Sequence, residues 1–539
     1  MSVPAAELTA PSLSSHAAST HVLARRFAGG RLYIALGALA LVIAAASLLI
    51  PSTPSYDPWA WLVWGREIVH LKLQTTGGPT WKPLPVIFTT VLAPFGSVAP
   101  DLWLVVARAG ALMAVAMVFK VATRLTRQLT GTARGPVLLA GVIGGGSLAV
   151  SGGFVIDNAL GYSEGLMTAL VLIAVDRHLD GKRRQAFAVG FAAALDRPEL
   201  WLFWGPYGLY LWWKDPGARR LVIALFGLIP VLWFLPEYWG SGHFFRGVSR
   251  AHTPRSNSPA FASCPFCSLL VKHAWPTVLL RVKVVAGIAM LAAAVGLWRT
   301  RRAWTSGASE VETRRSWLRG AWPSQPRARL ALLGAGAAGL GWWMLIGVLT
   351  QAGFSGNDRY LVLGAALVAI AGGAGWGWAA QALAKLAARL TRPAIASGAA
   401  LLSAVVVFMA VPPWIGAHII DVQGTHRAAV DQALLREGAA AAVRKLGGPA
   451  NVLRCGTVMT EGFQVPMLAW TLGVPTLRVE GSPTKGQPLP PAPEIIFQTR
   501  AQPHRSLLPR VRDWPNVPYR VVARTHTFRV YSRCAGNLT

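Results

Sequence analysis

Charged residues are scarce in this chain of 539 residues, and that scarcity excludes an ordinary soluble protein. Asp, Glu, Lys and Arg make up 14% of the sequence, whereas soluble globular proteins carry about 25%. Hydrophobic residues make up 53%. Apolar runs long enough to cross about 30 Å of hydrocarbon recur along the chain, for example at 32–50, 221–235, 285–298, 330–349 and 399–411. The composition therefore predicts an all-α polytopic membrane protein.

Acidic residues are also few: 22 Asp and Glu are set against 52 Lys and Arg, a net charge of +30. This excess does not indicate a nucleic-acid partner, because the basic residues lie mostly in short loops between apolar runs. That placement is the positive-inside pattern of membrane proteins. It predicts a multi-pass plasma-membrane protein with a cytoplasmic N-terminus and an extracytoplasmic tail. The basic clusters lie at 25–31, 120–134, 182–184, 214–220, 299–319 and 385–392.

The apolar pattern divides the chain into three parts. Residues 1–30 are polar and rich in Ala and Ser, which predicts a disordered cytoplasmic N-terminus. Residues 31–414 are predicted to form the membrane domain, with about eleven transmembrane helices, and residues 415–539 a small extracytoplasmic α/β domain. The predicted spans lie near 32–50, 102–120, 135–153, 163–177, 185–196, 200–213, 220–236, 275–298, 328–350, 360–380 and 395–414.

Two regions outside the spans have their own patterns. In the first outer loop, 51–101, we expect interfacial helices at 56–71 and 83–95, the former anchored at the membrane surface by Trp59, Trp61 and Trp64. In the tail, alternating and apolar runs predict strands at 451–454, 476–479 and 494–498, a helix at 461–472, and a hairpin of 519–523 with 528–532.

Cysteine is rare, and all four cysteines fall on the predicted outer side, where disulfides persist. Cys264 and Cys267 form a lone C-x-x-C pair, which is weak evidence for a metal and favours a local disulfide. Cys455 and Cys534 are expected to pair within the tail. The histidines show no ligand spacing and no phosphate-binding glycine loop is present, so no metal or cofactor is predicted.

Ionisable residues beside a membrane are candidate functional residues, because placing them there is costly. Asp57 follows the first span; it is either a general base or a cap of the helix that begins at Pro58. Lys82 lies among turn formers and one aromatic residue. Its ammonium group either meets a phosphate as a point charge or snorkels to the membrane surface.

Several short motifs resemble, in order and spacing, the GT-C glycosyltransferases over residues 30–380. The nearest branch is that of protein O-mannosyltransferases and lipid A aminoarabinose transferases. The second carboxylate common after the first span in the O-mannosyltransferases is absent, since Pro58 follows Asp57, and the Lys-Pro-Pro element reads Lys82-Pro83-Leu84-Pro85. The motifs are Asp57, Arg66-Glu67-Ile68, Gly77-Gly78-Pro79-Thr80-Trp81-Lys82-Pro83-Leu84, Phe95-Gly96, Ala107-Arg108, Tyr162-Ser163-Glu164-Gly165-Leu166, Leu195-Asp196-Arg197-Pro198-Glu199 and Ser355-Gly356-Asn357-Asp358-Arg359-Tyr360.

The resemblance implies a role for each of six residues. Asp57 would be the base that deprotonates the acceptor. Fixed positive charge would stabilise the departing lipid phosphate, from Lys82, Arg197 and Arg359. Asp157 and Glu164 would orient either partner. The competing interpretations are local ion pairs, of Arg197 with Asp196 or Glu199 and of Arg359 with Asp358.

The function that this resemblance implies is transfer of a sugar from a polyprenyl-phosphate donor to an extracytoplasmic acceptor, with inversion at the sugar. The acceptor would be a cell-envelope glycan, a lipid or a protein, and membrane lipids would surround the enzyme. The alternative is a transporter or lipid-handling scaffold without enzymatic activity. A transporter is expected to carry charged residues deep in several spans, whereas here they gather at outer helix ends.

Overall fold

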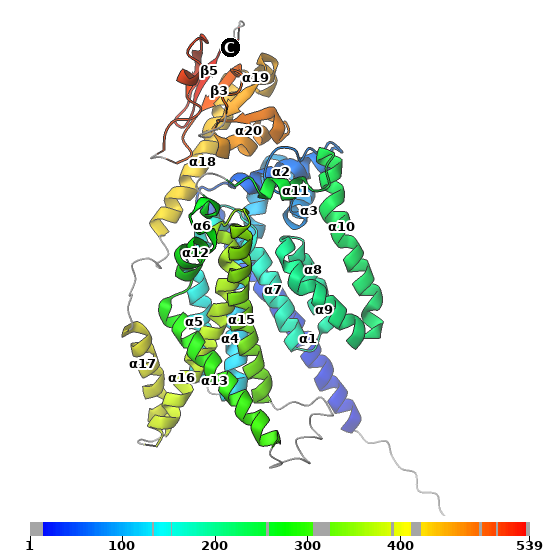
Figure 1. The fold of residues 1–539 in the computed structure, drawn as a ribbon, viewed down its shortest axis with the longest axis vertical. Coiled ribbons are helices and arrows are strands. Elements are labelled where there is room, and N and C mark those ends of the chain that lie inside the picture. The colour runs from blue at the N-terminus through cyan, green and yellow to red at the C-terminus, as the bar shows by residue number, and fades with distance from the viewer. Residues whose placement is uncertain are drawn as a thin grey trace, which may run out of the picture.

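The computed structural model describes residues 14–131, 134–151, 153–254, 258–305, 324–389, 393–410, 422–483, 488–502 and 505–534. A long helical bundle carries a small α/β domain at one end, which is drawn at the top of Figure 1. The bundle helices are α1 (Ser14–Ala46), α4 (Ala99–Thr130), α5 (Arg134–Ala149), α7 (Glu164–Leu179), α8 (Arg183–Ala194), α9 (Trp201–Lys214), α10 (Arg219–Ser241), α13 (Leu280–Thr305), α15 (Ser324–Gln351), α16 (Val362–Ala387) and α17 (Pro393–Ala410).

Each of the eleven predicted spans overlaps one of these helices over most of its length, and residues 411–414 of the last span lie outside the described residues. Six stretches in the described part of the chain are long and apolar enough to cross a membrane: Gly30–Leu49, Pro83–Thr130, Pro216–Ser241, Leu280–Arg302, Gln325–Gln351 and Asp358–Ala387. The protein is therefore a mostly helical, multi-pass membrane protein. Helices α5, α7, α8 and α9 have 16, 16, 12 and 14 residues, fewer than the roughly 20 that a span needs, so the number eleven stays a prediction.

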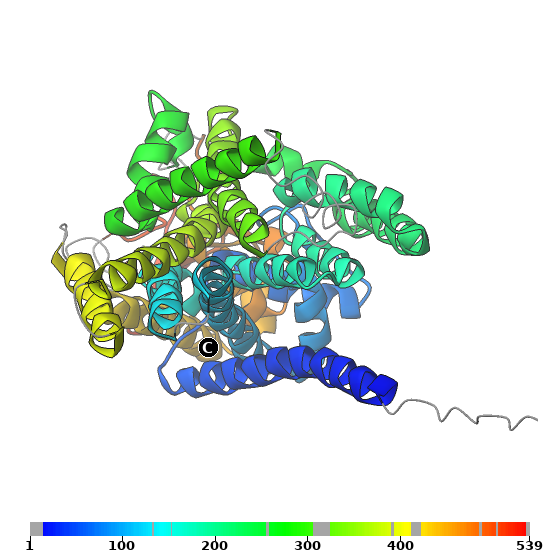
Figure 2. The same ribbon diagram turned by 90° about the horizontal axis from the view of Figure 1, so that it is seen from below.

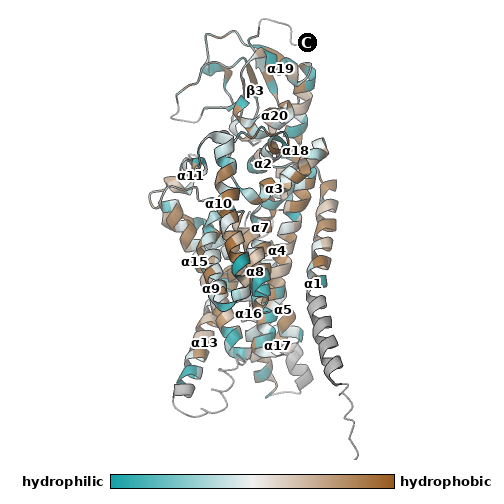
Figure 3. Cartoon of the chain, turned by 90° about the vertical axis from the view of Figure 1, so that its right-hand side faces the viewer, coloured by the Kyte–Doolittle hydropathy of each residue, from teal (hydrophilic) through white to brown (hydrophobic). Residues whose placement is uncertain are grey.

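Helix α16 is the centre of the bundle. It is buried along most of its length and packs against α4, α5, α13, α15 and α17. Small residues allow this close packing: a Cβ atom on Gly373 would lie only 2.5 Å from the carbonyl oxygen of Ala140. Seen from below, α1 crosses one side of the bundle (Figure 2), where it contacts α4. Exposed hydrophobic residues such as Ile34, Val42, Ile223 and Leu235 lie on α1 and α10, and both helices carry the brown of hydrophobic residues in Figure 3.

Short helices cap the end of the bundle that carries the α/β domain. Helix α2 was predicted as an interfacial helix, but its Trp59, Trp61 and Trp64 are at most 2% exposed. The prediction that they anchor the helix in the membrane surface is therefore wrong: Trp59 packs against Trp470 of the tail, Trp61 against Trp103 of α4, and Trp64 against Trp81. The short helices are α2 (Tyr56–Val69), α3 (Pro83–Leu92), α6 (Phe154–Ala159), α11 (Arg246–Ala251) and α12 (Pro265–Ser268).

The tail is an α/β domain with one five-stranded sheet in the order β2-β1-β3-β5-β4. Strands β1, β2 and β3 are parallel, and β5 runs antiparallel to β3 and β4. The strands are β1 (Val458–Thr460), β2 (Val479–Gly481), β3 (Ile495–Gln498), β4 (Arg520–Arg524) and β5 (Arg529–Ser532), and the helices are α18 (Val422–Lys445), α19 (Pro449–Cys455) and α20 (Val465–Leu472).

Some local predictions were wrong. Residues 451–454, predicted as a strand, lie in helix α19, because Pro449 at its first turn initiates a helix. Residues 476–478 form a 3-10 turn, and strand β2 begins only at Val479. The N-terminal segment predicted to be disordered is helical from Ser14, and residues 1–13 lie outside the described residues. The hairpin near the C-terminus and the helix after residue 461 are where the sequence placed them.

The tail lies directly on helix α2. Arg66 donates hydrogen bonds to the carbonyl oxygens of Trp470 and Val474, at 3.1 and 3.0 Å. The Trp59 and Trp470 rings lie 5.9 Å apart, and Tyr56 packs against Phe463 at 6.2 Å. The tail therefore covers the helix that carries Asp57.

Candidate active site

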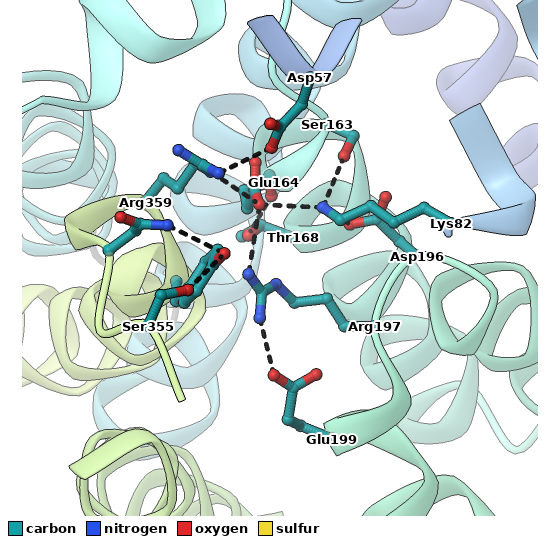
Figure 4. Close-up of polar contacts among 12 residues, drawn as sticks. Asp57, Lys82, Ser163, Glu164, Thr168, Asp196, Arg197, Glu199, Ser355 and Arg359 are labelled. Carbon is teal, nitrogen blue, oxygen red and sulfur yellow. Dashed lines mark hydrogen bonds and ion pairs between the residues drawn. The ribbon is translucent and has the colours of Figure 1, made fainter. Parts of the chain in front are cut away.

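Five of the charged residues singled out in the sequence, Asp57, Lys82, Glu164, Arg197 and Arg359, meet in one cluster (Figure 4). Glu164 is their common partner and is 1% exposed. Its Oε1 atom lies 3.1 Å from Lys82 Nζ, 3.4 Å from Arg197 Nη2 and 3.5 Å from Arg359 Nε. Because Glu164 is the first residue of α7, the positive end of the helix dipole also favours a carboxylate there.

Lys82 is held immediately before helix α3. It is the N-cap residue, and Pro83 occupies the first helical position, where its fixed φ angle suits a helix start. The Lys82 side chain points inward: its Nζ atom also lies 3.3 Å from Ser163 Oγ and 3.8 Å from Asp196 Oδ2. At 8% exposure, Lys82 does not snorkel to the membrane surface, and that alternative is wrong.

Asp57 makes an ion pair rather than a helix cap. Helix α2 begins at Tyr56 with Ser55 as its N-cap, so Asp57 is the second helical residue. Its Oδ2 atom accepts a hydrogen bond from Arg359 Nη2 at 2.7 Å. The capping alternative is therefore wrong, and the Asp57 carboxylate faces the charged cluster.

For Arg197 and Arg359 the competing interpretation was an ion pair with a carboxylate close by in the sequence, and the structure supports it only for Arg197. Arg197 does bond to its near neighbour Glu199, at 2.8 Å, and also reaches Glu164. Arg359 does not pair with Asp358, which instead lies 2.6 Å from His273 Nδ1. Its partners come from two other segments of the chain, so the local alternative is wrong for Arg359.

Aromatic residues complete the cluster, and sequence reasoning assigned them no role. The guanidinium group of Arg197 lies 3.4 Å from the ring centroid of Tyr360, and that of Arg359 lies 4.2 Å from Tyr162. Such cation–π contacts stabilise buried guanidinium groups. Both tyrosines are sequence neighbours of charged site residues, which is the signal that would have found them.

Asp157 stands apart from this network. It lies on α6 and is half-buried, and burial raises its pKa to about 7, opposed mainly by the charge of Arg359. No hydrogen bond or ion pair joins its side chain to another side chain in the described ranges. Of the two residues predicted to orient the substrates, only Glu164 contacts the cations.

The charges of the cluster nearly balance. Lys82, Arg197 and Arg359 face the carboxylates of Asp57, Glu164, Asp196 and Glu199. Sequence reasoning treated Asp196 and Glu199 only as local partners of Arg197. Each cation thus has a carboxylate partner. An anion that binds to one of the cations would have to replace a carboxylate contact.

The cysteines lie in two pairs elsewhere. Cys264 and Cys267 are bonded, with Cα atoms 5.3 Å apart, and Cys455 is bonded to Cys534 in the tail, with a Cα separation of 5.9 Å. Within the described part of the chain, no group of three or more His, Cys, Asp and Glu residues is placed to hold a metal ion.

No protein-family model and no curated protein matches the chain. Its structure is similar to that of ArnT from Cupriavidus metallidurans bound to undecaprenyl phosphate, with a TM-score of 0.47 and 14% identity over 94% of this chain and 98% of that chain. For ArnT from Cupriavidus metallidurans in the apo state, the TM-score is 0.46 and the identity 14%, over 94% and 99% of the two chains.

Proposed function

We propose that the protein is an inverting membrane glycosyltransferase that moves a sugar from a polyprenyl-phosphate donor to an extracytoplasmic acceptor. One observation carries the proposal: Asp57, Lys82, Arg197 and Arg359 gather around Glu164 at one end of the bundle, beneath the tail. This arrangement combines a base and fixed positive charge at the membrane surface, which the reaction requires.

The reaction step follows from these groups. Asp57 accepts the proton of an acceptor hydroxyl while that oxygen bonds to the anomeric carbon of the sugar. The bond between the anomeric carbon and the phosphate oxygen breaks, and its electron pair leaves with the lipid phosphate. Lys82 and Arg197 stabilise the negative charge that develops there. The acceptor attacks from the opposite side, so the configuration at the anomeric carbon inverts.

The paired charges suit a site that must hold an anion only part of the time. Three buried cations without partners would be strongly destabilising in the empty protein. Glu164 and Asp196 pair with Lys82, Glu164 and Glu199 pair with Arg197, and Asp57 and Glu164 pair with Arg359. The donor phosphate takes over contacts of Lys82 and Arg197 on binding. Arg359 remains paired with Asp57 and orients it. Asp157, which lies nearby without a side-chain partner, is proposed to orient the acceptor.

The experiment that tests this function uses the purified protein in detergent or nanodiscs. It is incubated with a panel of polyprenyl-phosphate sugars, and release of the lipid phosphate is measured. We expect release with at least one donor, and we expect Lys82→Ala to weaken donor binding. Intact donors throughout, together with equal donor binding by wild type and Lys82→Ala, would refute the proposal.

A further inference from the structure

The loop that leads into Lys82, residues 74–82 and here called the Lys82 loop, is held by a residue of the next outer segment. Arg246, the first residue of α11, donates hydrogen bonds to three carbonyl oxygens of this loop. Its Nη1 atom lies 2.8 Å from Pro79 O, and its Nη2 atom lies 3.1 Å from Gly78 O and 3.2 Å from Thr76 O. The guanidinium group thus binds the backbone at positions three to six residues before Lys82.

This contact is buried and its charge is balanced. The Arg246 side chain is 10% exposed, and Glu237, at 3%, lies 3.5 Å from its Nη1 atom. Glu237 belongs to the outer end of α10. Arg246 is therefore anchored to a bundle helix through Glu237. Neither Arg246 nor Glu237 contacts the cluster around Glu164.

Three further hydrogen bonds join the Lys82 loop to α10 and α11. Thr75 N donates to Gly240 O at 3.0 Å, and the indole of Trp81 donates to Leu232 O at 3.0 Å. Arg250 adds one bond to Gly78 O at 3.1 Å. Gly78 has a φ of +98°, which glycine alone adopts readily, so the loop has one defined shape.

An arginine suits this role better than any other side chain. A guanidinium group has five N–H donors in a rigid planar fork, so it serves several carbonyl oxygens at once. A lysine ammonium group at the end of a flexible stem does not reproduce that geometry. Without Arg246, the carbonyl oxygens of Thr76 and Pro79 would lose this donor and that of Gly78 would keep only Arg250. The loop would then gain freedom immediately before Lys82.

We propose that Arg246 is a positioning residue, which holds the Lys82 loop so that Lys82 Nζ meets the donor phosphate. This inference rests on the proposed transferase function. Arg246 acts only through the loop, so its loss should weaken donor binding more than it slows chemistry. Glu237 supports it by neutralising and orienting the guanidinium group.

The test measures donor KM, kcat and hydrogen exchange of residues 74–82 in the full-length protein. For Arg246→Ala we expect at least a tenfold rise in donor KM, a change in kcat below threefold, and faster exchange confined to this loop. Arg246→Lys should recover little, and Arg250→Gln, which removes a single bond to this loop, should cause a smaller rise. Arg219→Gln, at the opposite end of α10, is the matched control and should resemble wild type.

The outcomes separate the inference from the proposed function. Unchanged KM in Arg246→Ala, or faster exchange without a rise in KM, would overturn the positioning role. If Arg246→Ala does not fold, Glu237→Gln carries the same test and should raise KM severalfold. If wild type transfers no sugar from any donor, the function itself fails, while exchange in the loop still reports whether Arg246 holds it.

Discussion

At the residue scale, the site is a set of buried charges that satisfy one another. Glu164 contacts Lys82, Arg197 and Arg359 through a single carboxylate oxygen. Burying charges is costly, and replacing such groups with apolar residues often stabilises a protein. Their presence here is therefore better explained by a ligand charge that must be met than by stability.

A second buried carboxylate gives a pH-dependent prediction. Glu67 on α2 is 6% exposed, and one of its oxygens accepts a hydrogen bond from Gln74 N at 2.9 Å. Burial raises its pKa from about 4.5 to about 7, against the smaller opposing effects of that bond and of Arg66. Below about pH 4.5 both the folded and the unfolded protein hold the Glu67 proton, so the folded state does not bury a charged carboxylate. As the pH rises toward 7 the unfolded protein releases this proton first, and the free energy of unfolding falls.

Glu67→Gln fixes the neutral form and removes this dependence. We expect the melting temperature of the variant, relative to wild type, to rise between pH 5 and pH 8, with a slope of up to about 1.4 kcal/mol per pH unit in the free energy of unfolding. Glu437→Gln, an exposed glutamate on α18, is the control. A difference in melting temperature between Glu67→Gln and wild type that stays constant from pH 5 to pH 8 would contradict the raised pKa of Glu67.

Much of the site was predictable at this scale, because charged residues beside a membrane are rare enough to stand out. Asp57, Lys82, Glu164, Arg197 and Arg359 were all singled out, and the structure brings these five together. Their pairing was not predictable. A sequence shows the neighbours of Arg359 along the chain, but its partners Asp57 and Glu164 are set by how distant helices pack.

At the scale of elements, prediction succeeded where the pattern was long and failed where it was short. The apolar spans cover many residues, and all fall on helices. Strand β1 has only three residues and was missed. The pattern of residues 451–454 predicts a strand only weakly, because four residues carry little periodicity, whereas Pro449 favours the start of the helix that the structure has there. Tryptophans at this spacing are typical of an interfacial helix, and only tertiary packing against α4, Trp81 and the tail buries those of α2.

The tail also provides a prediction at this scale. Cys455 ends helix α19 and Cys534 follows strand β5, so a disulfide between them closes a loop across 79 positions. A bridge closing so long a loop is expected to stabilise the domain by roughly 2–5 kcal/mol. Mass mapping of unreduced protein from an oxidising compartment should find the two cysteines linked. Two free thiols in such protein would rule the bridge out.

At the scale of the whole molecule, a second charged cluster lies between α1, α4 and α7. Asp176 contacts Lys120, Arg124, Arg177 and Tyr33. Lys120 and Arg124 lie in the half of α4 away from Asp101 and the tail. These two residues, which belong to a basic cluster predicted to be cytoplasmic, thus lie away from the candidate active site, where a positive-inside arrangement would place them.

Orientation in the membrane follows as a prediction. A reporter fused after residue 539 should behave as extracytoplasmic, and one inserted within 303–325 as cytoplasmic. The same experiment, repeated at each inter-helix loop, counts the transmembrane helices. It distinguishes the eleven predicted spans from a bundle in which only the six long apolar stretches cross the membrane. A cytoplasmic signal from the C-terminal fusion would place the candidate site on the wrong side of the membrane for an extracytoplasmic acceptor.

The most direct test of the central claim is sugar transfer by Asp57→Asn beside wild type, with donor binding measured on the same preparations. Asparagine keeps the size of the side chain and one oxygen that accepts from Arg359, but it does not accept a proton from the acceptor. If Asp57 is the base, transfer should fall by about 10²–10⁴-fold, while donor affinity and melting temperature stay close to those of wild type. Transfer at the wild-type rate would show that the carboxylate is structural and that this site does not work as proposed.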